Sequence, residues 1–213
     1  MKLKKYIKSI RLLLLVGLVV SASSCYKTDI DLISNDLVWS PNFSIPVGAN
    51  VFMLKARDTI NVKPGNFYTF PRIPRYDTLE FDLSDLFDIR DVIDSMVFRV
   101  NIMNEFPAQG EVFIFYPENG QQPSYSRSLT GDKPIEIAEG KIDAEGKVTI
   151  PAKKTLDIPV TSSQIDDLMT SHRLIIRTYV RNLYVTEAVK NNYMTYRFIT
   201  QLGMQAQIVK AYE

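Results

Sequence analysis

The feature that most constrains the fold is a period-two alternation of apolar and polar residues in the second half of the chain. Phe98, Val100 and Ile102 alternate with Arg99 and Asn101. Successive side chains on a β-strand point to opposite faces of its sheet, so this pattern predicts a strand with one buried and one solvated face. Similar patterns at short intervals predict further strands over residues 51–54, 67–70, 79–83, 112–116, 156–160, 174–181, 194–198 and 202–208.

Three segments are more specific. Residues 112–116 are apolar on both faces, which is typical of a central strand of a sandwich. Residues 141–148 contain a turn in which Gly146 takes the left-handed conformation that a bulged hairpin requires. Pro41 and Pro46 exclude a central strand at the start of the folded body and favour an edge strand.

A short helix interrupts the run of strands. Thr161 and Gln164 fit a capping box, and Ile165, Leu168 and Met169 lie at i, i+3 and i+4 on one helical face. Such a helix is common in immunoglobulin-like sandwiches, where it crosses from one sheet to the other. The sequence therefore predicts an all-β fold, an immunoglobulin-like β-sandwich with one short helix between late strands.

The N-terminus has the pattern of an export signal. Five basic residues occur among the first eleven, residues 12–20 are apolar, and residues 21–24 are small. A membrane-spanning helix needs about 20 apolar residues, and this run reaches serines after Val20. We therefore expect a signal peptide over residues 1–24, a tether over 25–36 and a β-sandwich domain over 37–213. An alternative to one undivided domain stays open: residues 37–95 form a small β subregion that packs on a core sandwich of residues 96–213.

Cys25 is the single cysteine and follows the small residues directly. The leader resembles a bacterial lipoprotein signal, in which this cysteine is lipidated and becomes the first residue of the mature chain. Ala22 departs from the leucine that such signals usually carry three residues before the cysteine. The alternative is an ordinary cleavage site that leaves a free thiol, but a partnerless thiol is a liability in an oxidising compartment. The resemblance implies an outer-membrane lipoprotein that is anchored by palmitate and other acyl chains.

The tether and the net charge bear on location and partners. Lys27 followed by Asp29 and Asp31 resembles the surface-export signals of Bacteroidetes-type lipoproteins, whereas a plain solvated tether is the simpler interpretation, so cell-surface exposure stays open. Removal of residues 1–24 lowers Lys and Arg from 25 to 20 against 24 Asp and Glu. This mildly acidic chain lacks the basic surface that nucleic-acid binding needs.

The body also resembles a group of proteins. The likeness covers residues 104–107, 112–116, 142–148, 158–164 and 174–178, together with 39–41 and 45–47. These segments are similar to those of uncharacterised Bacteroidetes-type cell-envelope lipoproteins with a β-sandwich body. They are core and turn segments, so the resemblance implies the fold and the envelope location but carries no catalytic residues.

The sequence contains no clear catalytic or metal-binding pattern. His172 is the only histidine, which leaves one possible base for a triad and no histidine-rich metal site. The aspartates at 85, 88, 91 and 94 suggest calcium ligands, but the apolar residues between them at helical spacing favour the solvated side of a helical turn. We therefore expect no enzyme activity, metal or cofactor, and keep an enzyme of unrecognised type as a third alternative.

Binding is the function class that remains. Sugar rings stack on exposed aromatic side chains, and predicted loops contain or adjoin four tyrosines: Tyr116, Tyr125, Tyr184 and Tyr193. The simpler interpretation is that tyrosines pack at strand ends. Two hypotheses apply to Arg99, Arg177, Arg181 and Arg197. In the first they share a sheet face and bind an anionic partner. In the second, which is simpler, they pair with the acidic excess.

We therefore predict a membrane-anchored lipoprotein of the cell envelope that binds or assembles with another envelope protein. The alternative is a carbohydrate-binding accessory lipoprotein of a glycan-uptake system.

Overall fold

The computed structural model describes residues 42–71, 75–80, 93–118, 121–171 and 173–208. The predicted signal peptide and tether, with Cys25, lie outside the described residues. So do His172 and three of the four regularly spaced aspartates.

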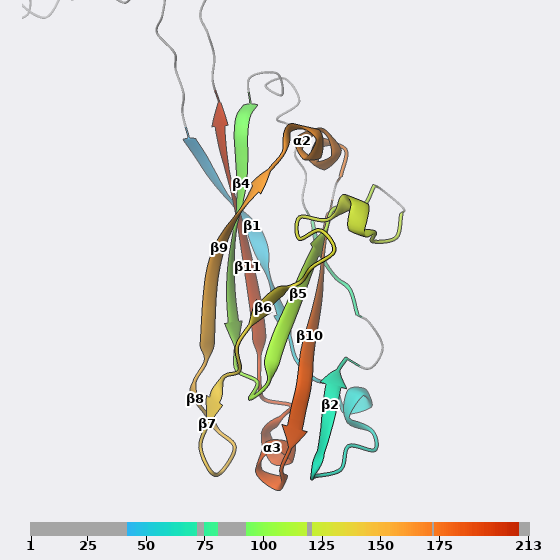
Figure 1. Ribbon diagram of the computed structural model, residues 1–213, viewed down its shortest axis with the longest axis vertical. Coiled ribbons are helices and arrows are strands. Elements are labelled where there is room, and N and C mark those ends of the chain that lie inside the picture. The colour runs from blue at the N-terminus through green and yellow to red at the C-terminus, as the bar shows by residue number, and fades with distance from the viewer. Residues whose placement is uncertain (1–41, 72–74, 81–92, 119–120, 172, 209–213) are drawn as a thin grey trace, which may run out of the picture. The chain divides into compact units, whose positions relative to one another are not determined.

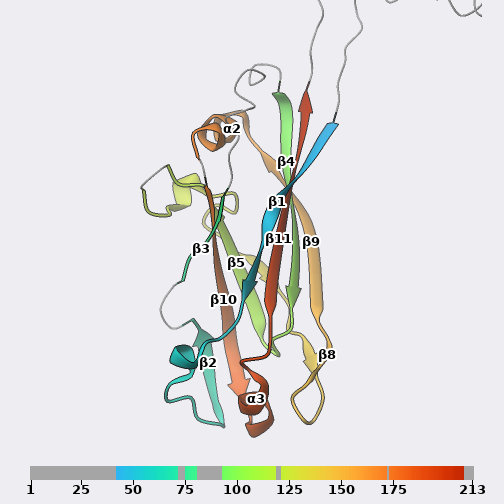
Figure 2. The same cartoon turned by 180° about the vertical axis from the view of Figure 1, so that it is seen from behind.

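The described residues form two antiparallel sheets (Figures 1 and 2). The first, here called the β4 sheet, has the order β1 (Asn42–Phe52), β11 (Phe198–Ile208), β4 (Ile93–Asn104) and β9 (Ala152–Val160). The second, the β10 sheet, has the order β2 (Asn66–Phe70), β10 (Arg173–Val185), β5 (Gln109–Phe115) and β6 (Ile135–Ile137), and β3 (Asp77–Glu80) also pairs with β10. A hairpin of β7 (Lys141–Ile142) and β8 (Val148–Ile150) completes the strands.

The core lies between the inner faces of the two sheets. Phe98 and Val100 of β4 are fully buried, and so are Leu174, Ile176 and Val180 of β10. Residues of both sheets belong to one continuous apolar cluster. The predicted all-β, immunoglobulin-like sandwich is therefore confirmed, and the alternation in the sequence marks its inner faces correctly.

The first strands of the body belong to these same two sheets. β1 is an edge strand of the β4 sheet, as the prolines predict. Its register with β11 shifts between Pro46 and Gly48. β2 and β3 both pair with β10. The described part of residues 37–95 thus contributes strands to both sheets.

Two helices connect the late strands. α2 (Ser162–Met169) has the predicted capping box, buries the three predicted apolar residues, and links β9 of one sheet to β10 of the other. α3 (Glu187–Asn192) follows β10 and is capped by the Thr186 hydroxyl, which accepts a hydrogen bond from Val189 N at 3.1 Å. The sequence analysis missed α3, because a six-residue helix with one buried residue gives no periodic pattern.

The end of the chain also differs from the prediction. The prediction of two separate strands over 194–198 and 202–208 is wrong, because β11 runs without a break over residues 198–208. Gly203 lies opposite Arg99 of β4 and Pro46 of β1, so it is paired on both sides within the sheet. Met194 lies in the turn after α3, and Tyr196 lies between that turn and β11.

The β7–β8 hairpin is fixed against α3 through its glycine. Gly146 has φ +82°, and a Cβ there would lie 2.5 Å from Ala188 O. The buried Tyr196 hydroxyl donates a hydrogen bond of 2.5 Å to Gly146 O. Asn192 Nδ2 donates to Glu145 O at 2.8 Å. Gly146 is therefore required both by the turn and by close packing.

A buried side-chain amide connects the β4–β5 turn to the segment that follows β6. Asn104, at the end of β4, is fully buried. Its Nδ2 donates to Ala108 O and to Ala138 O, both at 2.8 Å, and its Oδ1 accepts from Phe106 N at 3.0 Å. One side chain therefore forms hydrogen bonds with two backbone groups between β4 and β5 and with one that follows β6.

Tyr196 generates a prediction about alkaline stability. Burial, with a smaller effect of Asp143, raises the pKa of Tyr196 to about 12. Since a tyrosine in an unfolded chain has a pKa of about 10, the protonated phenol stabilises the fold below pH 10 and this contribution is lost as the pH rises toward 12. In urea unfolding experiments, the free energy of unfolding of the wild type should fall as the pH is raised from about 10 to about 12. The fall should be up to about 3 kcal/mol larger than in Tyr196→Phe. Parallel pH profiles for the two proteins would contradict this expectation.

Candidate binding face on the β10 sheet

An aromatic cluster lies on the outer side of the β10 sheet. Arg177 and Tyr179 of β10 alternate with buried residues and so point away from the core. In the register of the sheet, Arg177 lies opposite Phe113 and Ile175 lies opposite Phe115. We call this cluster the aromatic face, and it consists of Tyr76, Phe113, Phe115, Tyr125, Ile175, Arg177 and Tyr179.

Arg177 occupies the centre of the aromatic face. Its guanidinium carbon lies 4.5 Å from the ring centroid of Phe113, 5.2 Å from Phe115, 5.4 Å from Tyr179, 5.7 Å from Tyr125 and 5.9 Å from Tyr76. Each distance is within the range of a cation–π interaction. Nη2 of Arg177 also donates a hydrogen bond of 2.9 Å to the Tyr125 hydroxyl. The rings and this hydrogen bond together fix the position of the guanidinium.

Two tyrosines form the solvent boundary of the aromatic face. Phe115 is only 1% exposed although it lies outside the sandwich core. Tyr125 packs over Phe113 and Phe115, with ring centroids 5.7 Å and 5.9 Å apart. Tyr125 itself is 51% exposed and Tyr76 is 43% exposed. Their rings are therefore available to a ligand.

Arg177 differs from the other arginines that the sequence analysis selected. Arg99 pairs with Asp157 at 2.7 Å, Arg181 with Glu111 at 2.7 Å, and Arg197 with Glu105 at 2.7 Å. The predicted pairing with acidic residues is confirmed for these three. Arg177 has no carboxylate partner among the described residues, and its Nε is buried there without a hydrogen-bond partner.

The ionisation states of the aromatic face follow from its burial. Burial raises the pKa of Tyr179, so its phenol is neutral at physiological pH. Burial on its own lowers the pKa of Arg177, but the hydrogen bond to Tyr125 and the nearby phenols outweigh it and leave that pKa raised. The face therefore presents the positive charge of Arg177 beside the neutral phenol of Tyr179.

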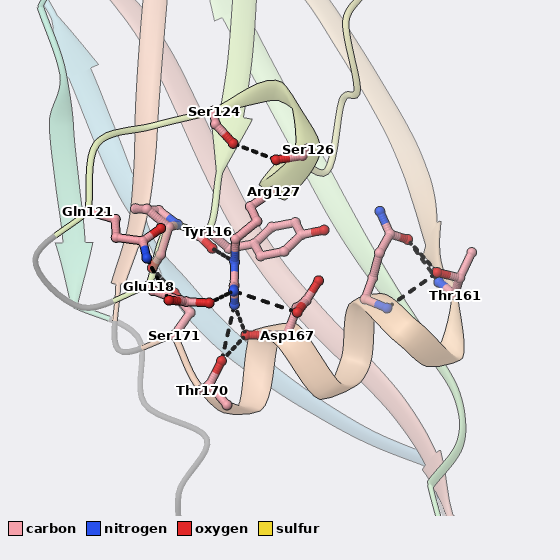
Figure 3. A network of polar contacts seen from close by, with 12 residues as sticks. Tyr116, Glu118, Gln121, Ser124, Ser126, Arg127, Thr161, Asp167, Thr170 and Ser171 are labelled. Atoms are coloured by element: carbon pink, nitrogen blue, oxygen red, sulfur yellow. Dashed lines mark hydrogen bonds and ion pairs between the residues drawn. The ribbon is translucent and has the colours of Figure 1, made fainter.

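The loop that carries Tyr125 is fixed to α2 by Arg127 (Figure 3). Tyr125 and Arg127 both belong to the short 3₁₀ turn η4 (Tyr125–Arg127). Arg127 Nη2 donates to Asp167 O at 2.7 Å and to Thr170 Oγ1 at 3.1 Å, at the C-terminal end of α2. Its Nη1 pairs with Glu118. These contacts hold the loop, and with it the ring of Tyr125, over the sheet.

The four tyrosines predicted as ligand contacts do not form one site. Tyr125 belongs to the aromatic face, whereas Tyr184 is 46% exposed and packs on Phe67 of β2, with ring centroids 4.9 Å apart. Tyr116 is fully buried in the sandwich core, so its interpretation as an exposed ligand contact is wrong. Tyr193 is half-buried and packs against the same core.

Sequence reasoning missed Tyr76 and the central position of Arg177. The alternation along β10 does place Arg177 and Tyr179 on the same outer face. The alternation gives no information about which strands flank β10. In the structure, β5 places Phe113 on one side of Arg177, and the residue just before β3, Tyr76, lies on the other side. The missing signal is therefore the pairing of strands that are distant in sequence.

The described residues contain no group of three or more His, Cys, Asp or Glu side chains placed to hold a metal ion. A search of the same residues finds no helix with the length and apolar character needed to cross a membrane.

Comparisons with known proteins show weak likeness only. No family model matches this sequence, and no curated protein matches it. Among solved structures, Desmodium yellow mottle tymovirus is similar with a TM-score of 0.31 and 9% identity, over 83% of this chain and 84% of that chain. Winged bean acidic lectin, solved with methyl-α-D-galactose, is similar with a TM-score of 0.25 and 10% identity, over 81% of this chain and 100% of that chain.

The Arg127 network generates a prediction about loop order. Arg127→Ala removes the hydrogen bonds to α2, so the amides of the loop around Tyr125 should exchange with solvent roughly 10 to 100 times faster, as measured by hydrogen exchange and mass spectrometry. Arg99→Ala is the matched control, because it removes an exposed ion pair on the β4 sheet. Unchanged loop protection in Arg127→Ala would show that other contacts hold Tyr125 in place.

Proposed function

We propose that this protein is a lipid-anchored protein of the cell envelope that binds another envelope component through the aromatic face. The observation that carries the proposal is the partly exposed ring cluster around Arg177, which lies outside the sandwich core. Tyrosine and arginine dominate the energetics of many binding surfaces, because they combine a large contact area with directional polar groups. The aromatic face offers both residue types in a fixed arrangement.

The anchoring part of the proposal rests on the leader and on Cys25. Each acyl methylene buried in a membrane contributes about 0.8 kcal/mol, and a single chain holds a protein only marginally. Two or more chains on Cys25 would give stable attachment without a membrane-spanning segment. The outer membrane is the proposed location, with exposure at the cell surface as part of the same proposal.

A carbohydrate-binding role is the second candidate. Its support is the exposure of the Tyr125 and Tyr76 rings, because flat aromatic faces stack on the C–H faces of sugars. The pair of Phe67 and Tyr184 on β2 and β10 offers a further exposed aromatic surface. In this case the protein would serve as an accessory lipoprotein of glycan uptake.

Lipidation at Cys25 can be tested by metabolic labelling. Cells that express the full chain are grown with radioactive palmitate, and the protein should become labelled and partition into the membrane fraction. The Cys25→Ser variant should lose the label and appear in the soluble fraction. A native protein that carries no label, or a Cys25→Ser variant that remains labelled, would refute the anchor.

Glycan binding can be tested with a glycan array. The wild type should retain one class of saccharide, and Tyr125→Ala combined with Tyr76→Ala should lower that retention at least tenfold, because both exposed rings are lost. Met194→Ala is the control, since Met194 is 44% exposed and lies outside the aromatic face. No retention of any saccharide by the wild type would leave a protein partner as the ligand.

A further inference from the structure

We propose that the aromatic face selects saccharides that carry a carboxylate, with Arg177 binding the carboxylate and the rings of Tyr125 and Tyr76 stacking on the sugar. This inference deepens the carbohydrate-binding candidate and rests on it. It names the class of ligand, acidic sugars of the uronic-acid type, that the chemistry of the face fits.

The charge of the face supports an anionic ligand. Arg181 lies on the same side of β10 as Arg177, but Glu111 pairs with it at 2.7 Å. Arg173 also lies on this side, and its Nη2 donates to Gln121 O at 2.9 Å rather than to a carboxylate. Arg173 lies opposite Glu80 of β3 in the register of the sheet, whereas Arg177 has no carboxylate partner among the described residues.

The geometry of Arg177 supports a carboxylate in particular. A guanidinium presents a planar fork of N–H donors that matches the two oxygens of a carboxylate. Here the plane is already held by five rings and by the hydrogen bond to Tyr125, so little side-chain entropy remains to be lost on binding. Nη2 donates to the Tyr125 hydroxyl, Nε is buried without a hydrogen-bond partner among the described residues, and the side chain as a whole is partly exposed.

The position of the face on the sheet favours a saccharide over an acidic peptide. β10 pairs with β2 and β3 on one side and with β5 on the other, and β5 also pairs with β6. The backbone groups beneath the face are therefore used within the sheet, and a peptide cannot add there as a further strand. The face presents the rings of Tyr125 and Tyr76 beside one cation, which suits a sugar that offers a C–H face and a carboxylate.

The test compares polygalacturonate oligomers with their methyl esters, which have the same sugar ring but no negative charge. Isothermal titration of the mature protein in detergent at low salt should give at least tenfold tighter binding of the acid than of the ester. Arg177→Met should abolish this difference between the acid and the ester, and Arg177→Lys should keep part of it, because it keeps the charge but not the fork. Raising the salt concentration should weaken binding of the acid alone.

Controls separate this inference from the broader proposal. Arg99→Met, on the β4 sheet, should behave as the wild type, and thermal unfolding checks that each variant is folded. Equal binding of the acid and the ester by the wild type would overturn the acid selectivity while leaving carbohydrate binding intact. Binding of neither would overturn this inference, and the glycan array would then decide the broader carbohydrate-binding candidate. Binding of polyglutamate as tightly as polygalacturonate would overturn the saccharide assignment.

Discussion

The fold depends on the burial of the alternating inner side chains of two sheets against each other. Phe98 and Val100 on β4 face the core that Ile176 and Val180 on β10 also fill, and all four are fully buried. Burying one such side chain contributes about 1.5–3 kcal/mol, so the many residues of this core supply most of the driving force for folding. Both β4 and β10 are paired on each side, and the remaining described strands of the two sheets assemble around them.

Polar contacts then fix the connections that the apolar core leaves undetermined. Asn104 satisfies three backbone groups at the end of β4, and the neighbouring Glu105 binds both the backbone N–H and the guanidinium of Arg197. Tyr196 bonds the β7–β8 hairpin through Gly146. These bonds add little net energy each, but a buried group left unpaired would be costly, so they select one arrangement of the loops.

The outer face of β10 results from the same strand that builds the core. Because successive side chains alternate, a strand that places Leu174 and Ile176 inside must place Ile175 and Arg177 outside. Phe113 on β5 would then be exposed, but Arg177 and the loop fixed by Arg127 cover it. The result is a second small cluster with an aromatic boundary, and the proposed binding role concerns this boundary.

The sequence alone determined the local features: the strands with a strict alternation, the capped helix α2, the edge position of β1 and the side of β10 on which Arg177 lies. Each depends on residues within one segment, so a periodic pattern suffices to predict it. Only the tertiary structure decided which tyrosines are exposed: Tyr116 is buried and Tyr125 is not, although they lie nine residues apart. Likewise, only the pairing of β10 with β3 and β5 brings Tyr76 and Phe113 to Arg177, because alternation fixes the face of a side chain but neither its register nor its neighbouring strands.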